Sequence, residues 1–268
     1  MIDTEFLLEC RRNAYISCTM QFIEKNNVVG YFGEHIPLEI FYGYNLFPVP
    51  LEDVDADVFA FSSDDIKNDK TLCDCIRSTL TYLETDKCPI LHSCKAFVFA
   101  PVCKKFFSAF SNLTKKDCVV LPNEYSEWEA YLKKLLASFS DTAYDSASAY
   151  NAKKKLDYIS STISKIERKT KITTEELFLL QYYTPYILEL DERVQYFKDL
   201  EQQLVFSDYD FKRPHFSLPC PRGYFRDAVS YMPSQAKVSW GDSSGDFADS
   251  HCFISAPINV HYSSSNKI

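Results

Sequence analysis

The chain has 268 residues, of which 46% are hydrophobic and 25% charged, a balance typical of a soluble globular protein. The formal net charge of -8 would repel a phosphate backbone, and the 6 glycines form neither a Walker loop nor a G-x-G-x-x-G motif, so we expect no nucleic-acid partner and no classical nucleotide site. No apolar run approaches the roughly 20 residues that span a bilayer, and the N-terminus lacks the pattern of a signal peptide. We therefore expect a cytoplasmic protein with no membrane partner.

Short apolar runs alternate with helical patterns over residues 1–122, which we assign to a first α/β lobe. The apolar runs predict strands at 28–32, 47–51, 58–61, 88–91 and 118–121. The helical patterns predict helices from Asp3 to Asn26, from Pro37 to Tyr42, and over 72–83 and 96–110. Such alternation predicts a parallel sheet covered by helices on both faces.

Residues 123–207 read as a helical middle region without strands. Ser126 is an expected cap for its first helix, and a long polar helix is expected from Tyr144 to Lys169. Thr173 and Glu176 form a capping-box pattern before a helix over 177–204, which Pro185 should kink.

Residues 208–268 predict a partial second α/β lobe. We expect strands at 215–218 and 237–240 with a short helix at 223–231 between them. A lobe of this size leaves strand edges and an apolar face uncovered, so we expect self-association or a partner subunit.

Cysteine is the residue type most suggestive of chemistry, because ten cysteines in a reducing compartment indicate metal ligation, redox chemistry or buried packing. Cys73 stands at the start of an expected helix, where the helix dipole stabilises a thiolate. Cys75, two residues further on, should point to the opposite side of that helix. Cys94 follows the expected strand at 88–91, and open parallel sheets bind ligands beyond the carboxyl ends of their strands. We therefore expect Cys73 and Cys94 to face one cleft, with simple burial of all ten thiols as the alternative.

Two sequence blocks resemble the 2-hydroxyacyl-CoA dehydratase family, which includes the double-cubane-cluster proteins. The block from Gly30 to Ile40, with its Pro37-x-Glu39, followed by Leu46-Phe47-Pro48-Val49, is similar to the opening of that family. Cys73-Asp74-Cys75-Ile76-Arg77-Ser78 is similar to its first ligand motif, and Cys94 stands where the second ligand is expected. Further similarity at 172–177 and 215–223 extends the resemblance over nearly the whole chain.

The resemblance implies an iron–sulfur subunit from an anaerobe that binds a [4Fe–4S] cluster through Cys73 and Cys94. Such a lyase subunit takes part in one-electron, radical-type elimination of water from a 2-hydroxyacyl-CoA, beside a second dehydratase-type subunit and an ATP-dependent activator protein. Family members complete the second lobe and supply a third cluster cysteine there, whereas neither Cys220 nor Cys252 lies in a matching segment. The alternative is therefore a shortened, cluster-free relative that acts as a non-catalytic partner or scaffold.

Overall fold

The computed structural model describes residues 2–51, 61–68, 74–101, 104–211, 215–218, 237–240 and 260–261. For residues 67, 74, 75 and those from 215 onward it describes the backbone alone. Most of the strand expected at 58–61 and the whole helix expected at 223–231 lie outside the described residues. None of the described helices is both long and apolar enough to cross a membrane.

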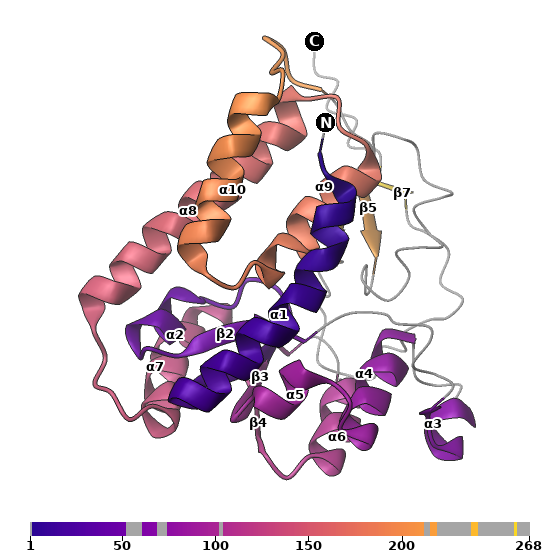
Figure 1. Ribbon diagram of the computed structural model, residues 1–268, viewed down its shortest axis with the longest axis vertical. Coiled ribbons are helices and arrows are strands. Elements are labelled where there is room, and N and C mark those ends of the chain that lie inside the picture. The colour runs from indigo at the N-terminus through magenta and orange to yellow at the C-terminus, as the bar shows by residue number, and fades with distance from the viewer. Residues whose placement is uncertain are drawn as a thin grey trace.

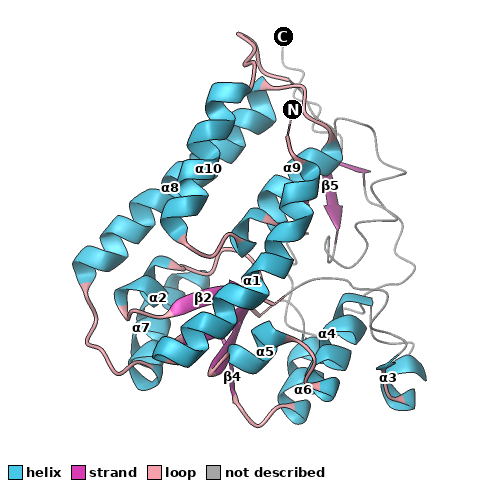
Figure 2. Cartoon of the chain, in the orientation of Figure 1, coloured by secondary structure: helices cyan, strands magenta, loops and turns pink. Residues whose placement is uncertain are grey.

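A four-stranded parallel sheet forms the centre of the first part of the chain (Figures 1 and 2). Its order is β2-β1-β3-β4, with β1 at Val28–Phe32, β2 at Phe47–Pro50, β3 at Ala96–Phe99 and β4 at Asp117–Val120. Every residue of β1, β2 and β3 is buried, as expected for continuous apolar runs covered on both sides. The predicted α/β fold with a parallel sheet is confirmed.

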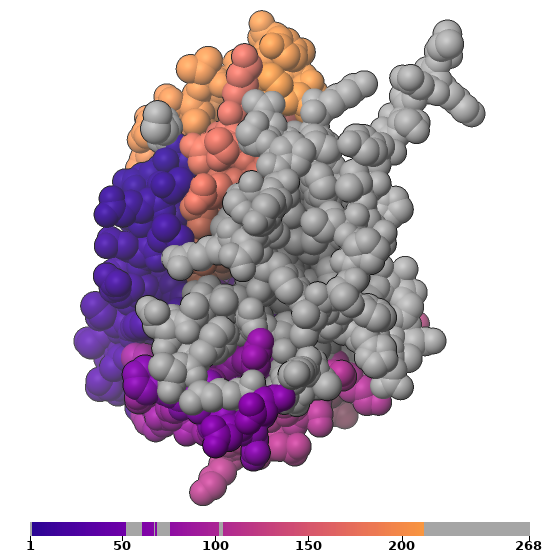
Figure 3. Space-filling model, turned by 90° about the vertical axis from the view of Figure 1, so that its right-hand side faces the viewer, coloured from indigo at the N-terminus to yellow at the C-terminus, as the bar shows by residue number. Residues whose placement is uncertain are grey.

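Helices cover both faces of this sheet. On one face lie the apolar residues of α1 (Thr4–Lys25), α4 (Asp74–Thr85), α5 (Pro89–Ser93) and α6 (Lys104–Leu113), and on the other those of α2 (Glu39–Gly43) and α7 (Trp128–Phe139). Strand β3 shows the division clearly, because Phe97 and Phe99 join the first cluster and Ala96 and Val98 the second. A further short helix, α3, spans Asp64–Asn68. In Figure 3, α1 (indigo) flanks the molecule between the helical region above and α4–α6 below.

Two predicted elements in this region are wrong. Residues 88–91 do not form a strand: Pro89 opens α5, where its fixed φ and missing N–H suit the first helical turn. The Nζ atom of Lys116 donates to the carbonyl oxygens of Leu91 and His92 at 3.0 and 2.6 Å, which stabilises the end of that helix. Residues 96–110 do not form one helix, because the run from Ala96 to Phe99 is the buried strand β3 and α6 begins only at Lys104.

The helical middle region is confirmed, since the fully described stretch 104–211 contains no strand between Ser126 and Gln203. Its long elements are α8 (Ser146–Lys169), α9 (Thr174–Tyr182) and α10 (Leu190–Gln203), and α8 and α10 lie side by side (Figure 1). The capping box of Thr173 and Glu176 is present. Two details differ from the prediction: Ser126 lies inside the 3-10 helix η2 (Tyr125–Glu127) and caps nothing, and Pro185 ends the helix instead of kinking it. A second 3-10 helix, η3 (Thr184–Tyr186), separates α9 from α10.

The last described strands form a separate three-stranded sheet of order β6-β5-β7. It contains β5 (His215–Leu218), β6 (Lys237–Trp240) and β7 (Val260–His261). β5 and β6 are parallel and β5 and β7 are antiparallel, so the two strands expected here are present.

Candidate functional site

Cys94 lies at the opposite edge of the sheet from the one that the sequence suggested. It follows α5 and precedes β3, and the N–H of its neighbour Lys95 donates to the carbonyl oxygen of Val28, the first residue of β1. Cys94 therefore sits at the amino ends of the strands. The prediction that it follows a strand was wrong because 88–91 is a helix.

Cys94 lies in the hydrophobic core. Its side chain is buried and the thiol donates to the carbonyl oxygen of Ile90, with 3.1 Å between sulfur and oxygen. Burial raises the pKa of this thiol well above its usual value, and the nearby Cys18 raises it further. In this structure Cys94 is therefore a packing residue of the core.

Cys18 and Cys88 are buried like Cys94 and lie close enough to influence its pKa. Burial raises the pKa of Cys18 to about 12. Within the described part of the chain, no group of three or more His, Cys, Asp or Glu side chains is placed to hold a metal ion.

The other cysteines of the predicted site cannot be compared with Cys94. Cys73 lies outside the described residues, and for Cys75 the backbone alone is described, inside α4. The predicted proximity of Cys73 and Cys94 therefore stays a prediction. In chain order, the cysteine between the carboxyl end of β3 and the start of α6 is Cys103, which also lies outside the described residues.

The strand order places the best candidate site at the carboxyl ends of β1 and β3. The chain passes from β1 to β2 on one side of it and then returns to place β3 on the other side, so the order in which strands are added reverses between β1 and β3. Parallel sheets bind ligands in the crevice at such a switch point, where the two connections diverge. Gly33, Glu34 and His35 follow β1 here, and Ala100 and Pro101 follow β3.

The backbone at this point is unusual. Gly33 has a φ of +109°, and a Cβ atom placed on it would lie 2.5 Å from the Cβ of Ala100, so only glycine fits between the two strand ends. His35 also adopts the left-handed region, with a φ of +62°, which costs a non-glycine residue energy and is found disproportionately at functional sites.

Two carboxylates lie in this connection. Glu34 accepts a hydrogen bond from the hydroxyl group of Tyr182, at the end of α9, with an O–O distance of 2.7 Å. The imidazole Nε2 of His35 lies 3.9 Å from the other carboxylate oxygen of Glu34. Glu39, in the first turn of α2, lies 3.9 Å from the Nζ of Lys153 on α8. The resemblance drew attention to Glu39, but Glu34 was missed because only the strand order reveals its position.

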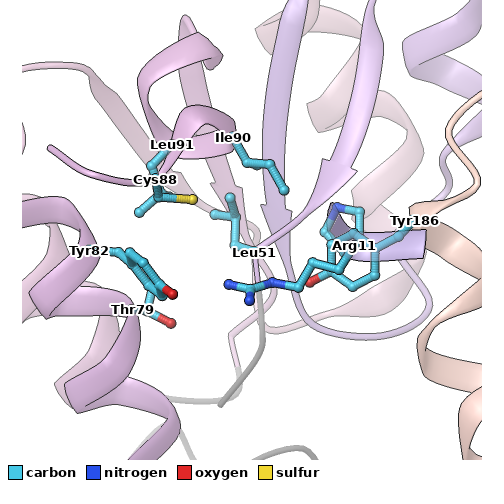
Figure 4. Close-up of a pocket in the computed structure, with 9 residues that line it drawn as sticks. Arg11, Leu51, Thr79, Tyr82, Cys88, Ile90, Leu91 and Tyr186 are labelled. Carbon is cyan, nitrogen blue, oxygen red and sulfur yellow. The ribbon is translucent and has the colours of Figure 1, made fainter. Parts of the chain in front are cut away.

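A small pocket lies between α1, α4 and α5, beside the end of β2 (Figure 4). Figure 4 shows the Arg11 guanidinium directed toward the hydroxyl groups of Thr79 and Tyr82, with Leu51 and Cys88 above it. The guanidinium carbon lies 5.5 Å from the centroid of the Tyr82 ring, a cation–π contact. The pocket volume of about 10 Å³ is close to the minimum that holds one water molecule, so the space between these residues does not accommodate an acyl thioester.

No protein-family model matches the chain, and a search of curated proteins finds no match.

Proposed function

We propose that the chain is a 2-hydroxyacyl-CoA dehydratase-like subunit that binds the acyl thioester at the carboxyl ends of β1 and β3. The observation that carries this proposal is the position of the block from Gly30 to Glu39. These residues bear the resemblance, and they form the end of β1, its connection and the start of α2, beside the switch point. A ligand site at a switch point is the general expectation for this type of sheet.

Within this proposal, the chain's own residues supply two functions. Glu34, held by Tyr182, provides a fixed carboxylate at the strand ends. Glu39 provides a second carboxylate near Lys153. The proposal includes an active lyase in the cytoplasm that works beside a second dehydratase-type subunit and an ATP-dependent activator, as the resemblance implies. It does not rely on Cys94 as a ligand, because the Cys94 thiol packs in the core and donates to the carbonyl oxygen of Ile90.

The burial of Cys94 also favours a second candidate function, a cluster-free relative that serves as a partner or scaffold. Of the two cysteines predicted to bind a cluster, the one that the structure describes is a core residue. If Cys94 serves only in packing, the chain keeps the fold but lacks one of the two cysteines predicted to bind the cluster.

Anaerobic purification of the full chain with iron and sulfide analysis separates the two candidates. For the dehydratase-like subunit we expect about four irons per cluster, loss of iron in Cys73→Ala, and retained iron but reduced stability in Cys94→Ala. Cys103→Ala belongs in the same series, because Cys103 follows β3 at its carboxyl end in chain order. A chain without iron or sulfide after anaerobic purification supports the scaffold candidate, and loss of iron in Cys94→Ala would contradict our placement of Cys94.

A further inference from the structure

The two edge strands of the parallel sheet differ in how they are covered. Strand β2, at one edge, is buried along its whole length and contacts η3. Strand β4, at the other edge, pairs with β3 alone among the described strands, and its residues range from half-buried to exposed. An uncovered edge strand presents unpaired N–H and C=O groups to which another strand can bind. The edge of β4 is therefore a candidate interaction surface.

The hydrogen-bond pattern shows which backbone groups of β4 face its open side. The N–H of Leu121, directly after the strand, donates to the carbonyl oxygen of Phe99 on β3 at 2.8 Å. The backbone groups of successive residues point to opposite sides of a strand, so those of Val119 also face β3. Those of Cys118 and Val120 face away from β3, toward the open edge.

Residues on both sides of β4 limit the length of this open edge. Before the strand, the N–H of Lys116 donates to the Oγ1 atom of Thr114 at 3.1 Å. After the strand, Pro122 has no N–H. Its carbonyl oxygen accepts from the Nε1 atom of Trp128 at 2.7 Å. The backbone groups that remain for a partner strand are therefore those of β4 itself.

A second β4 strand in antiparallel orientation fits this short edge in one register. With a two-fold axis at Val119, Cys118 of each copy lies opposite Val120 of the other, and each such pair exchanges both of its N–H···O=C bonds. A shifted register would place Cys118 opposite Pro122 or Val120 opposite Lys116, where the N–H groups needed for pairing are absent or already used.

The residues that flank β4 are complementary in the same register. Lys115 lies before the strand and Glu124 after it, both are exposed, and neither has an ion-pair partner in the described part of the chain. Lys115 of one copy would lie opposite Asn123 of the other, beside Glu124, so each end of the strand pair brings opposite charges together. The same ends carry exposed apolar side chains, since Leu113 is 43% and Tyr125 61% exposed.

We propose that two copies of this chain associate through antiparallel pairing of their β4 strands about a two-fold axis at Val119, which joins the two parallel sheets into one continuous sheet. The same surface serves on both copies, so the assembly closes as a dimer. This surface lies on the first sheet and not on the second lobe, and it requires neither a metal nor a ligand. One short strand pair with its flanking side chains is a small interface, so we expect a dissociation constant in the micromolar range.

Sedimentation equilibrium of the full chain and of charge variants tests this proposal. We expect a monomer–dimer equilibrium for the wild type. Lys115→Glu and Glu124→Lys each place like charges at both ends of the strand pair, so each should raise the Kd of the dimer by about 10-fold. The double variant Lys115→Glu/Glu124→Lys restores opposite charges and should return the Kd to within about 3-fold of the wild-type value.

Val120→Pro tests the backbone pairing, because it removes an N–H that faces the partner and no hydrogen bond to β3, and it should also raise the Kd. Lys154→Glu is the matched control: it makes the same change in net charge at an exposed residue of α8, a helix that contacts α2 and α10, and should leave the Kd unchanged. Circular dichroism of each variant checks that the fold is retained.

Three results would overturn the proposal. The first is a wild-type chain that remains monomeric at millimolar concentration. The second is a dimer whose Kd is the same in Lys115→Glu, Glu124→Lys and Val120→Pro as in the wild type. The third is a dimer that Lys154→Glu weakens as much as Lys115→Glu does, because net charge and not the β4 edge would then govern association.

Discussion

The contact between Gly33 and Ala100 determines how closely β1 and β3 approach at their carboxyl ends, and its replacement should be costly. In Gly33→Ala, the new residue must adopt a φ of +109°, and its Cβ would lie 2.5 Å from that of Ala100. The strained backbone costs roughly 1–3 kcal/mol and the overpacking roughly another 1–3 kcal/mol. We therefore expect a loss of about 2–6 kcal/mol in the free energy of unfolding, a large part of the stability of an ordinary domain.

A double-mutant cycle separates the two contributions. Ala100→Gly alone should cost about 1 kcal/mol through the lost methyl group and added chain entropy. In the double variant Gly33→Ala/Ala100→Gly the clash is absent but the strained φ remains, so about 1–3 kcal/mol should be recovered relative to additivity. Urea unfolding followed by circular dichroism measures all four proteins. A cost below about 1 kcal/mol for Gly33→Ala, or additivity within about 0.5 kcal/mol, would refute this reasoning.

Three further predictions concern residues outside the candidate site. Arg193→Met should lower the free energy of unfolding by about 2–4 kcal/mol, because the buried guanidinium donates to two carbonyl oxygens before α10. The control Arg168→Met, at an exposed arginine, should change it by less than about 0.5 kcal/mol, and similar losses in both variants would contradict this role of Arg193. Hydrogen bonds from the Ser148 hydroxyl and the Ala147 N–H lower the pKa of Asp145, the N-cap of α8, so the stability that its carboxylate contributes is present above the unfolded pKa and lost as pH falls through the folded pKa. The difference in the free energy of unfolding between the wild type and Asp145→Asn should therefore shrink below about pH 4. A difference that stays constant with pH would contradict this. Cys94 should resist iodoacetamide in the native chain and react in urea, as peptide mapping by mass spectrometry would show, and rapid native labelling would contradict its burial.

Periodicity predicted most elements of the fold because these segments carry their own local signals. Apolar residues at helical spacing predicted α1: Leu7, Cys10, Ala14 and Cys18 are buried, whereas Phe22, the last residue of the same row, is 37% exposed. The capping box at Thr173 marked the start of α9. The errors occurred in short apolar runs, where a buried strand and a buried helix have the same composition. Cys88–Leu91 and Ala96–Phe99 were interchanged in this way, although Pro89 was a signal for a helix start.

The misplacement of Cys94 followed directly from that interchange. A helix at 89–93 moves the cysteine from the carboxyl end of a supposed strand to the amino end of β3. Glu34 was missed for a different reason, since its position depends on β3 lying next to β1, a pairing between residues far apart in sequence. The glycine, glutamate and histidine directly after the buried strand at 28–32 were the available signal, and the strand order was needed to interpret it.

Hydrogen–deuterium exchange of the full chain, with and without a saturating 2-hydroxyacyl-CoA, tests most directly whether the ligand site lies at the carboxyl ends of β1 and β3. We expect protection in peptides that contain Gly33–Glu39 and Ala100–Pro101, and unchanged exchange in the peptide from Cys88 to Cys94 at the other edge of the sheet. Protection confined to the Cys88–Cys94 peptide, or no protection of the Gly33–Glu39 peptide with ligand bound, would contradict the proposed site.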